Sequence, residues 1–267
     1  MLDRCDRVQI AVHDAAKAAA RYRQLLGCEV ARHDRSRHLS AKRTILAVGE
    51  SEFELCEPDG AGATQDFLAR RGEGLMTAGY CTADPDAMVH RWEGLGVPYE
   101  RDGEQLYLGL EATFGLPMVI SASTYRRRVG PVSFLYETTN VLVSDWRRVA
   151  SVYAGLFGLD PSRFSEIGSE RFGYIGTLTL FDPPNRLDRI ELSQVTDEVH
   201  ATGMCPLPSA SASLRHSSFR VSNCRCMTRA VSQARSGCGI IPMTLRPSLT
   251  SSKDGLLIQS RSGSTTG

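Results

Sequence analysis

Apolar and polar positions along the chain first follow a strand pattern and then recur at helical spacing, and this change occurs twice in nearly the same form. Residues 7–27, RVQIAVHDAAKAAARYRQLLG, and residues 138–158, TTNVLVSDWRRVASVYAGLFG, align without a gap. In each copy a short apolar run, typical of a strand, precedes an aspartate, which is a good helix N-cap. Each helical pattern then ends at a glycine, which accepts the left-handed C-terminal turn. Each copy therefore predicts a strand followed by a capped helix.

Two weaker copies of the same pattern extend the repeat over the chain. Residues 74–96 place Asp84 before a helix that ends at Gly96, and residues 216–237 place Asn223 before another helix. The four cap residues follow one another at intervals of 70, 61 and 78 residues. Each interval leaves room after the helix for about three strands of ordinary length. The repeat therefore predicts an α+β fold of four βαβββ modules.

This repeat resembles the vicinal oxygen chelate (VOC) superfamily, which includes glyoxalase I, methylmalonyl-CoA epimerase, type I extradiol dioxygenases and the bleomycin-resistance proteins. There, two modules form one glyoxalase-like domain whose strands curl into a cup around a metal or ligand. The resemblance is clearest in residues 7–58 and 138–195. It implies a tandem arrangement, with an N-terminal domain over residues 1–125 and a C-terminal domain over residues 132–267, whose last module (205–267) is atypical.

Two segments have an unusual composition. Residues 124–131, TYRRRVGP, carry three arginines that could bind an anionic ligand, but a solvated basic linker is the favoured interpretation. Residues 205–267 contain 14 Ser and eight Arg or Lys against a single acid, Asp254. Such a bias is typical of a disordered basic tail, a nucleic-acid patch or a chain end that departs from its relatives. Because the module outline recurs there, we interpret it as a fourth module.

The resemblance implies four equivalent metal-ligand positions in a domain, usually occupied by His, Glu, His and Glu. In the N-terminal domain they fall on Arg7, Glu54, Thr77 and Val119. A protonated arginine has no lone pair to donate and valine has no donor atom. The sequence therefore predicts that the N-terminal domain lacks metal ligands, and it makes Glu54 either a polar wall of the cup or a solvent-facing residue.

In the C-terminal domain the same positions fall on Thr138, Glu191, His216 and Gln259. Glu191, His216 and Gln259 can coordinate a hard or borderline divalent metal, and we predict that they form a metal site. A neutral glutamine in place of a glutamate would lower the negative charge of the site. The alternatives remain open: a solvated His216, a Glu191 that faces water, and a Gln259 without a role.

An N-terminal domain without metal-ligating residues, followed by a C-terminal domain that has them, resembles the layout of type I extradiol dioxygenases and of 4-hydroxyphenylpyruvate dioxygenase. This implies an oxidoreductase with a divalent metal such as Fe(II). The substrate, for which aromatic compounds are included, would bind the metal through two vicinal oxygens. Those dioxygenases have His, His and Glu at the first, third and fourth positions, and this chain departs from that set. One alternative is a glyoxalase- or epimerase-like lyase or isomerase, with Glu191 as acid/base or ligand. Another is a metal-free small-molecule binding protein of the bleomycin-resistance type.

Composition excludes several other classes. With 42% apolar and 23% charged residues the chain can build two good cores, and a net charge of +1 does not favour a nucleic-acid partner. No apolar run approaches the roughly 18 residues of a membrane span, and the charged start lacks an apolar signal region. We therefore expect a cytoplasmic protein with reduced cysteines and no membrane partner. The sequence leaves the oligomeric state undecided, and a homodimer is one of the options.

Overall fold

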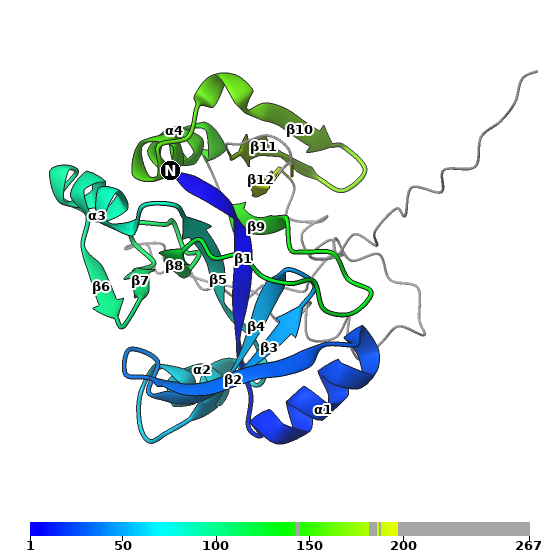
Figure 1. Cartoon of the computed structure of the whole chain (residues 1–267). Coiled ribbons are helices and arrows are strands. Elements are labelled where there is room, and N and C mark those ends of the chain that lie inside the picture. Colours follow the sequence, from blue (N-terminus) through cyan, green and yellow to red (C-terminus); the bar gives the residue numbers. More distant parts are fainter. Residues whose placement is uncertain (143–144, 182–185, 187, 197–267) are drawn as a thin grey trace, which may run out of the picture.

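The chain folds into curled β-sheets with few helices (Figure 1), and the α+β class is confirmed. Three of the four expected βαβββ modules lie in the part that the computed structural model describes. The fourth module, with His216 and Gln259, lies outside the described residues. No helix among the described residues is long and apolar enough to cross a membrane. The described residues are 1–142, 145–181, 186 and 188–196.

The first two modules form one eight-stranded sheet in the order β2-β3-β4-β1-β5-β8-β7-β6. Strands β1 and β5, the first strands of the two modules, pair antiparallel at its centre, so the modules join edge to edge. The strands are β1 (Leu2–Ala11), β2 (Glu29–Ser36), β3 (Ala41–Val48), β4 (Ser51–Pro58), β5 (Gly74–Thr82), β6 (Tyr99–Asp102), β7 (Gln105–Leu108) and β8 (Met118–Ala122), and the helices are α1 (Ala15–Leu26), α2 (Ala63–Arg71) and α3 (Pro85–Gly94).

The predicted helix signals act as expected in both modules. The Asp14 side chain accepts a hydrogen bond from the Lys17 backbone N–H at 2.8 Å, and Asp84 does the same for Ala87 at 2.9 Å. Helix α1 stops at Gly27, whose φ of 60° is the left-handed conformation that glycine adopts without strain. The cap predictions for both helices and the stop of α1 are therefore confirmed, whereas α3 ends at Gly94, two residues before the expected Gly96.

The third module repeats the topology of the first. Its sheet has the order β10-β11-β12-β9, which corresponds to β2-β3-β4-β1. Helix α4 again follows the first strand and packs on β11 and β12. The elements are β9 (Glu137–Leu142), α4 (Trp146–Phe157), a short 3₁₀ turn (Pro161–Arg163), β10 (Ser165–Ser169), β11 (Tyr174–Leu180) and β12 (Arg189–Val195).

Strand β9 departs from the gapless repeat by one residue. In the first module Arg7 pairs with Glu52 of β4. The repeat places Thr138 where Arg7 stands and Arg189 where Glu52 stands, but the residue that pairs with Arg189 is Glu137. Because side chains alternate along a strand, a slip of one residue turns each of them to the opposite face of the sheet.

Thr138 consequently faces the apolar core and not the inside of a cup. Its hydroxyl lies 2.5 Å from the hydroxyl of Tyr80, and both side chains are buried. The expectation that Thr138 occupies the first ligand position is therefore wrong, and Glu137 stands there. The slip is accompanied by a different entry into the helix, since Asp145 has a φ of 53° where Asp14 has an extended φ of −144°.

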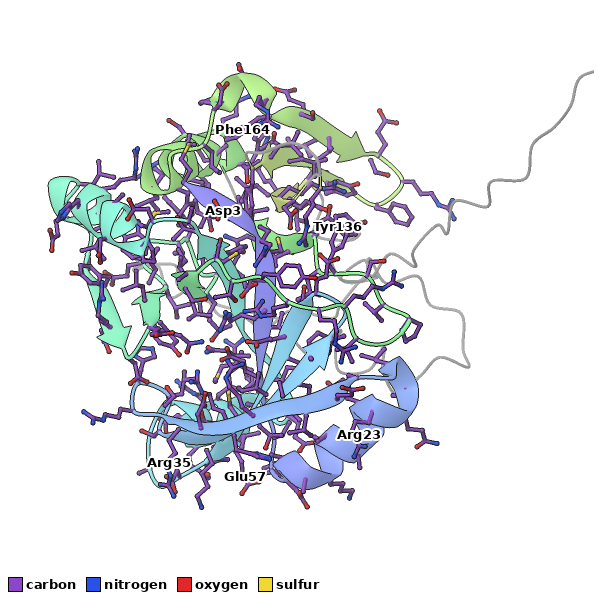
Figure 2. The ribbon with its side chains drawn as sticks, in the orientation of Figure 1. Asp3, Arg23, Arg35, Glu57, Tyr136 and Phe164 are labelled. Atoms are coloured by element: carbon purple, nitrogen blue, oxygen red, sulfur yellow. The ribbon has the colours of Figure 1, made fainter. Side chains whose placement is uncertain are left out.

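One continuous apolar core joins the N-terminal sheet to the third module, and side chains fill the space between them (Figure 2). Trp92 of α3 is fully buried and donates its indole N–H to the Leu156 carbonyl of α4 at 3.0 Å. The rings of Tyr80 and Phe181 meet edge to face at 5.9 Å between centroids. The third module is therefore held by packing and by specific hydrogen bonds as well as by the chain connection.

Asp188 adds a titratable group to this junction. It is 2% exposed, accepts a hydrogen bond from the Cys5 backbone N–H at 2.8 Å and lies 3.0 Å from the Arg186 guanidinium. Burial outweighs the nearby positive charge of Arg186 and raises the pKa of Asp188 from 3.8 to about 6. Between about pH 4 and pH 6, Asp188 is protonated in the folded state but ionised in the unfolded chain. The folded protein therefore becomes less stable, relative to the unfolded chain, as the pH rises through that range.

We expect Asp188→Asn to raise the free energy of unfolding at pH 7 by about 2–3 kcal/mol, since one pKa unit corresponds to about 1.4 kcal/mol. The amide keeps the acceptor for the Cys5 N–H but cannot ionise. At pH 4, where Asp188 is protonated in the folded state, the variant and the parent should be nearly equal in stability. Urea denaturation at both pH values measures the difference, and an equal gain at both would contradict the assignment to Asp188.

Candidate functional site

Polar side chains line the inside of the curled N-terminal sheet. Arg7 and Val119 both pair with Gly79, and cross-strand partners point to the same side of a sheet. Glu54 and Thr77 both pair with Gln9. Gln9 lies two residues after Arg7 on β1 and therefore on the same face. The four positions that the resemblance assigned to the N-terminal domain therefore do share one face.

Glu54 is held by four hydrogen bonds inside this cup. Its Oε1 accepts from Arg7 Nη1 and Gln105 Nε2, both at 2.8 Å, and its Oε2 accepts from Gln9 Nε2 at 2.9 Å and Arg43 Nη1 at 3.0 Å. An ionised carboxylate has about four lone-pair positions, so this set fills them. Glu54 is completely buried. It is a polar wall, the solvent-facing alternative is wrong, and its surroundings do not fit a metal ion.

Arg7 provides a fixed positive charge at the centre of the cup. Its Nε and Nη2 donate to Asp6 Oδ2 at 2.9 and 2.5 Å while Nη1 donates to Glu54, and the residue is 5% exposed. Burial by itself lowers the pKa of Arg7, but the surrounding carboxylates outweigh it and raise that pKa. Burial by itself raises the pKa of Asp6, and the guanidiniums of Arg7 and Arg126 lower it to about 2. The two groups remain ionised across the ordinary pH range.

Gly79 makes room for Arg7. A Cβ atom built at Gly79 would lie 2.1 Å from Arg7 Cγ and 2.8 Å from the Arg7 carbonyl oxygen, which is closer than real contacts allow. Glycine at this position of β5 therefore lets the arginine side chain cross the sheet toward Asp6 and Glu54. The sequence carried this signal as a glycine inside a strand pattern, which can mark a close approach.

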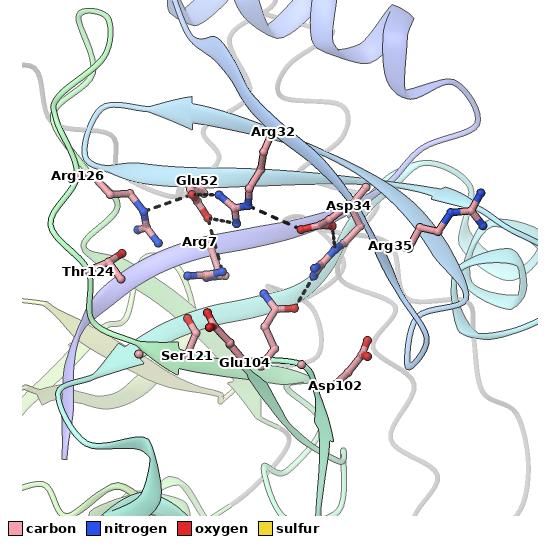
Figure 3. Close-up of a pocket in the computed structure, with 14 residues that line it drawn as sticks. Arg7, Arg32, Asp34, Arg35, Glu52, Asp102, Glu104, Ser121, Thr124 and Arg126 are labelled. Carbon is pink, nitrogen blue, oxygen red and sulfur yellow. Dashed lines mark hydrogen bonds and ion pairs between the residues drawn. The ribbon is translucent and has the colours of Figure 1, made fainter.

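A cavity of about 370 Å³ opens above Arg7 (Figure 3). Arg126, from the segment expected to be a solvated linker, turns into it: its Nη2 donates to Asp6 Oδ2 at 3.0 Å and its Nε lies 3.3 Å from Glu52. The solvated interpretation is therefore wrong for Arg126. It does describe Arg127, whose side chain is 75% exposed.

Glu191 lies on the face of the third-module sheet that corresponds to the cup. It is 6% exposed and accepts a hydrogen bond from the Ser193 hydroxyl, so the water-facing alternative is wrong. Burial raises the pKa of Glu191, and the negative charge of Glu137 raises it further. Glu137, itself 7% exposed, forms an ion pair with Arg189. Two buried carboxylates therefore lie near one another on this face.

The two first-strand ion pairs are reversed in charge. Arg7 lies 3.6 Å from Glu52 in the first module, and at the equivalent register Glu137 pairs with Arg189 in the third.

His216 and Gln259 lie outside the described residues, so the convergence of the predicted ligands stays a prediction. Among the described residues, no three His, Cys, Asp or Glu side chains are grouped so as to hold a metal.

Two βαβββ modules join edge to edge and curl around a polar interior, and together they define a cup-shaped domain. Residues 6–108 match the family model described as the Glyoxalase/Bleomycin resistance protein/Dioxygenase superfamily. The resemblance to that superfamily inferred from the repeat is therefore confirmed for this part of the chain. A search of curated protein sequences found no match.

Solved structures of the same superfamily resemble the chain. A variant of 4-hydroxymandelate synthase from Streptomyces coelicolor is 14% identical, and the match covers 77% of this chain and 67% of that one with a TM-score of 0.52, which shows the fold alone. Methylmalonyl-CoA epimerase from Streptomyces coelicolor, in complex with 2-nitronate-propionyl-CoA, is 26% identical over 46% of this chain and 100% of that one, with a TM-score of 0.41. The epimerase from Mycobacterium tuberculosis is 22% identical over 46% and 89%, with a TM-score of 0.42.

Proposed function

We propose that this chain is a small-molecule enzyme whose divalent metal is held by the C-terminal domain, beside a metal-free N-terminal domain. The contrast between the two equivalent glutamates carries this proposal. Glu54 accepts four hydrogen bonds in the N-terminal cup. Glu191 is buried, and its burial together with the charge of a second carboxylate, Glu137, raises its pKa. A divalent cation would relieve the repulsion between two buried carboxylates, whereas the N-terminal cup already has its cations.

The donor set on the C-terminal face suits a divalent metal. Carboxylate oxygens from Glu191 and Glu137 are hard ligands, and His216 and Gln259 complete the proposed set. Arg189 balances part of the charge through its ion pair with Glu137. A metal bound there would polarise the vicinal oxygens of a substrate. We propose ring cleavage of the extradiol dioxygenase type, with Fe(II), as the first reaction class.

A specific observation favours a second reaction class. Burial and the charge of Glu137 raise the pKa of Glu191, and a raised pKa makes a carboxyl group better suited to proton transfer. A lyase or isomerase of the glyoxalase or epimerase type would use Glu191 to move a proton on a carbon next to a carbonyl group. Purified protein that converts a catechol into a ring-opened product would exclude this class.

Metal content of the full chain, purified without chelator, tests the metal site. We expect His216→Ala to abolish bound metal and Glu191→Gln to weaken metal binding about tenfold or more, since even the loss of a group that only orients a metal ligand typically weakens binding by about that much. His90→Ala is the matched control, because His90 is 81% exposed. Elemental analysis gives the metal content, and circular dichroism checks that each variant is folded.

Two results would contradict the proposal in different ways. If the Glu54→Gln variant lost its metal while the Glu191→Gln variant kept it, the metal site would lie in the N-terminal cup. A folded parent protein that holds no metal and gains no thermal stability from added Fe(II), Mn²⁺ or Zn²⁺ would support the metal-free binding alternative, which the N-terminal cavity favours.

A further inference from the structure

Residues 124–129, which follow β8, form one side of the N-terminal cavity, and we call them the strap. Thr124 and Arg126 line this cavity together with Arg7 and Ser121 (Figure 3). The strap belongs to neither of the two sheets. A segment outside the sheets can move without breaking their hydrogen-bonded ladders, so this side of the cavity is the one best able to open.

Backbone hydrogen bonds fasten the strap at its two ends. Just before it, the Ser123 N–H donates to the Thr82 carbonyl at 2.8 Å. At its other end, Val129 and Gly49 exchange two hydrogen bonds, of 2.8 and 3.1 Å. Between these points the backbone groups of residues 125–127 make no hydrogen bond to another residue in the described part of the chain. The middle of the strap therefore depends on a side chain to hold it in place.

Arg126 is that side chain. It is 15% exposed, whereas Tyr125 and Arg127 on either side of it are 94% and 75% exposed. Its Nη1 and Nη2 donate to the two carboxylate oxygens of Asp6, Nη2 at 3.0 Å, and its Nε lies 3.3 Å from Glu52. Such a two-pronged pair between a guanidinium and a carboxylate fixes direction as well as distance. Arg126 therefore anchors the middle of the strap to the floor of the cup.

Release of Arg126 would leave neither carboxylate without a counter-charge. Asp6 keeps two hydrogen bonds from Arg7, at 2.9 and 2.5 Å, and Glu52 keeps two from Arg32, at 2.5 and 3.1 Å. Breaking a buried ion pair is most costly when it leaves a charge uncompensated, and that does not happen here. The anchor can therefore open at a cost below that of unfolding the domain.

We propose that the strap opens and closes over the N-terminal cavity while the rest of the domain stays folded, and that Arg126 holds it closed. Opening removes one side of the cavity and gives a small molecule a route to the fixed charge of Arg7. The cavity is therefore gated by an arginine of the chain itself. This inference is independent of the proposed C-terminal metal site.

Cleavage by chymotrypsin after Tyr125 measures the opening of the strap in the folded full chain. The tyrosine side chain is exposed, but a protease must also bind the backbone on both sides of it, which the closed strap hinders. We expect the cleavage rate to change little in urea below the unfolding transition, because local opening exposes little surface. A rate that rises with urea as steeply as global unfolding would overturn the proposal.

Three variants test the anchor. Arg126→Ala should raise the cleavage rate after Tyr125 about tenfold or more, since a hydrogen bond between charged groups contributes about that much and the rate follows the open population. Arg126→Lys keeps the charge but loses the two-pronged contact, so its rate should lie between. Arg127→Ala, at the exposed neighbour, is the control and should change the rate less than about twofold.

Each rate is divided by that of a peptide of residues 120–132 with the same substitution, which removes the preference of the protease for particular side chains. Circular dichroism checks that each variant is folded. Equal normalised rates for the parent and Arg126→Ala, or no cleavage of either protein after Tyr125, would overturn the proposal.

Discussion

Replacing Arg7 by Met is expected to lower the free energy of unfolding by about 3–5 kcal/mol, the usual cost of removing one partner of a buried ion pair. Arg7 is 5% exposed and supplies three donor nitrogens to Asp6 and Glu54. Methionine fills a similar volume but leaves both carboxylates short of a counter-charge. Urea denaturation followed by circular dichroism measures the loss.

Two comparisons separate charge from packing. Arg23→Met removes an exposed arginine from the outer side of α1 (Figure 2) and should change stability by less than about 0.5 kcal/mol. The double variant Arg7→Met, Glu54→Gln should recover part of the loss, because it removes an unpaired buried charge. If the double variant were less stable than Arg7→Met by the full cost of Glu54→Gln alone, the electrostatic explanation would fail.

Trp92→Ala is expected to have an effect of similar size, about 3–5 kcal/mol, because it opens a large cavity in the core. Trp92 is completely buried, and its indole donates to the Leu156 carbonyl across the junction between α3 and α4. Tyr125→Ala is the control, since Tyr125 is 94% exposed.

The Trp92 variant also tests whether the junction is a structural unit. Because one core joins the N-terminal sheet to the third module, both parts should unfold in the same transition in the parent. Limited proteolysis of Trp92→Ala should then expose sites in α4 and in α3 together. Cleavage that begins in α4 while the N-terminal sheet keeps its full stability would show that the two parts fold independently.

Local signals made the module architecture predictable. Asp14 and Asp84 could be assigned as caps because a cap acts within one helical turn. The register of β9 could not be assigned in the same way, since it depends on pairing with β12, about fifty residues away, and a gapless repeat hides a slip of one residue. Helix α2 carries no such local signal at its start: residues 58–64 have turn composition, although the helix begins at Ala63.

The site was predictable only in part. Residue chemistry alone indicated that Arg7 cannot coordinate a metal, and the structure adds that Glu54 has no free acceptor. The enclosure of the cup was not predictable, because it is built by side chains from distant segments such as Arg126. The hydroxyl of Ser121 gives no signal in the sequence, since its lack of a partner is a property of the folded wall.

The fit between Gly79 and Arg7 makes a metal-binding histidine difficult to introduce at position 7. A descendant with histidine there would leave Asp6 and Glu54 without their guanidinium and a gap over the bare glycine. That intermediate would be less stable than the present protein before it could bind any metal. Several substitutions would have to occur together to change the centre of the cavity. We therefore expect its rim to change more readily than its centre during evolution.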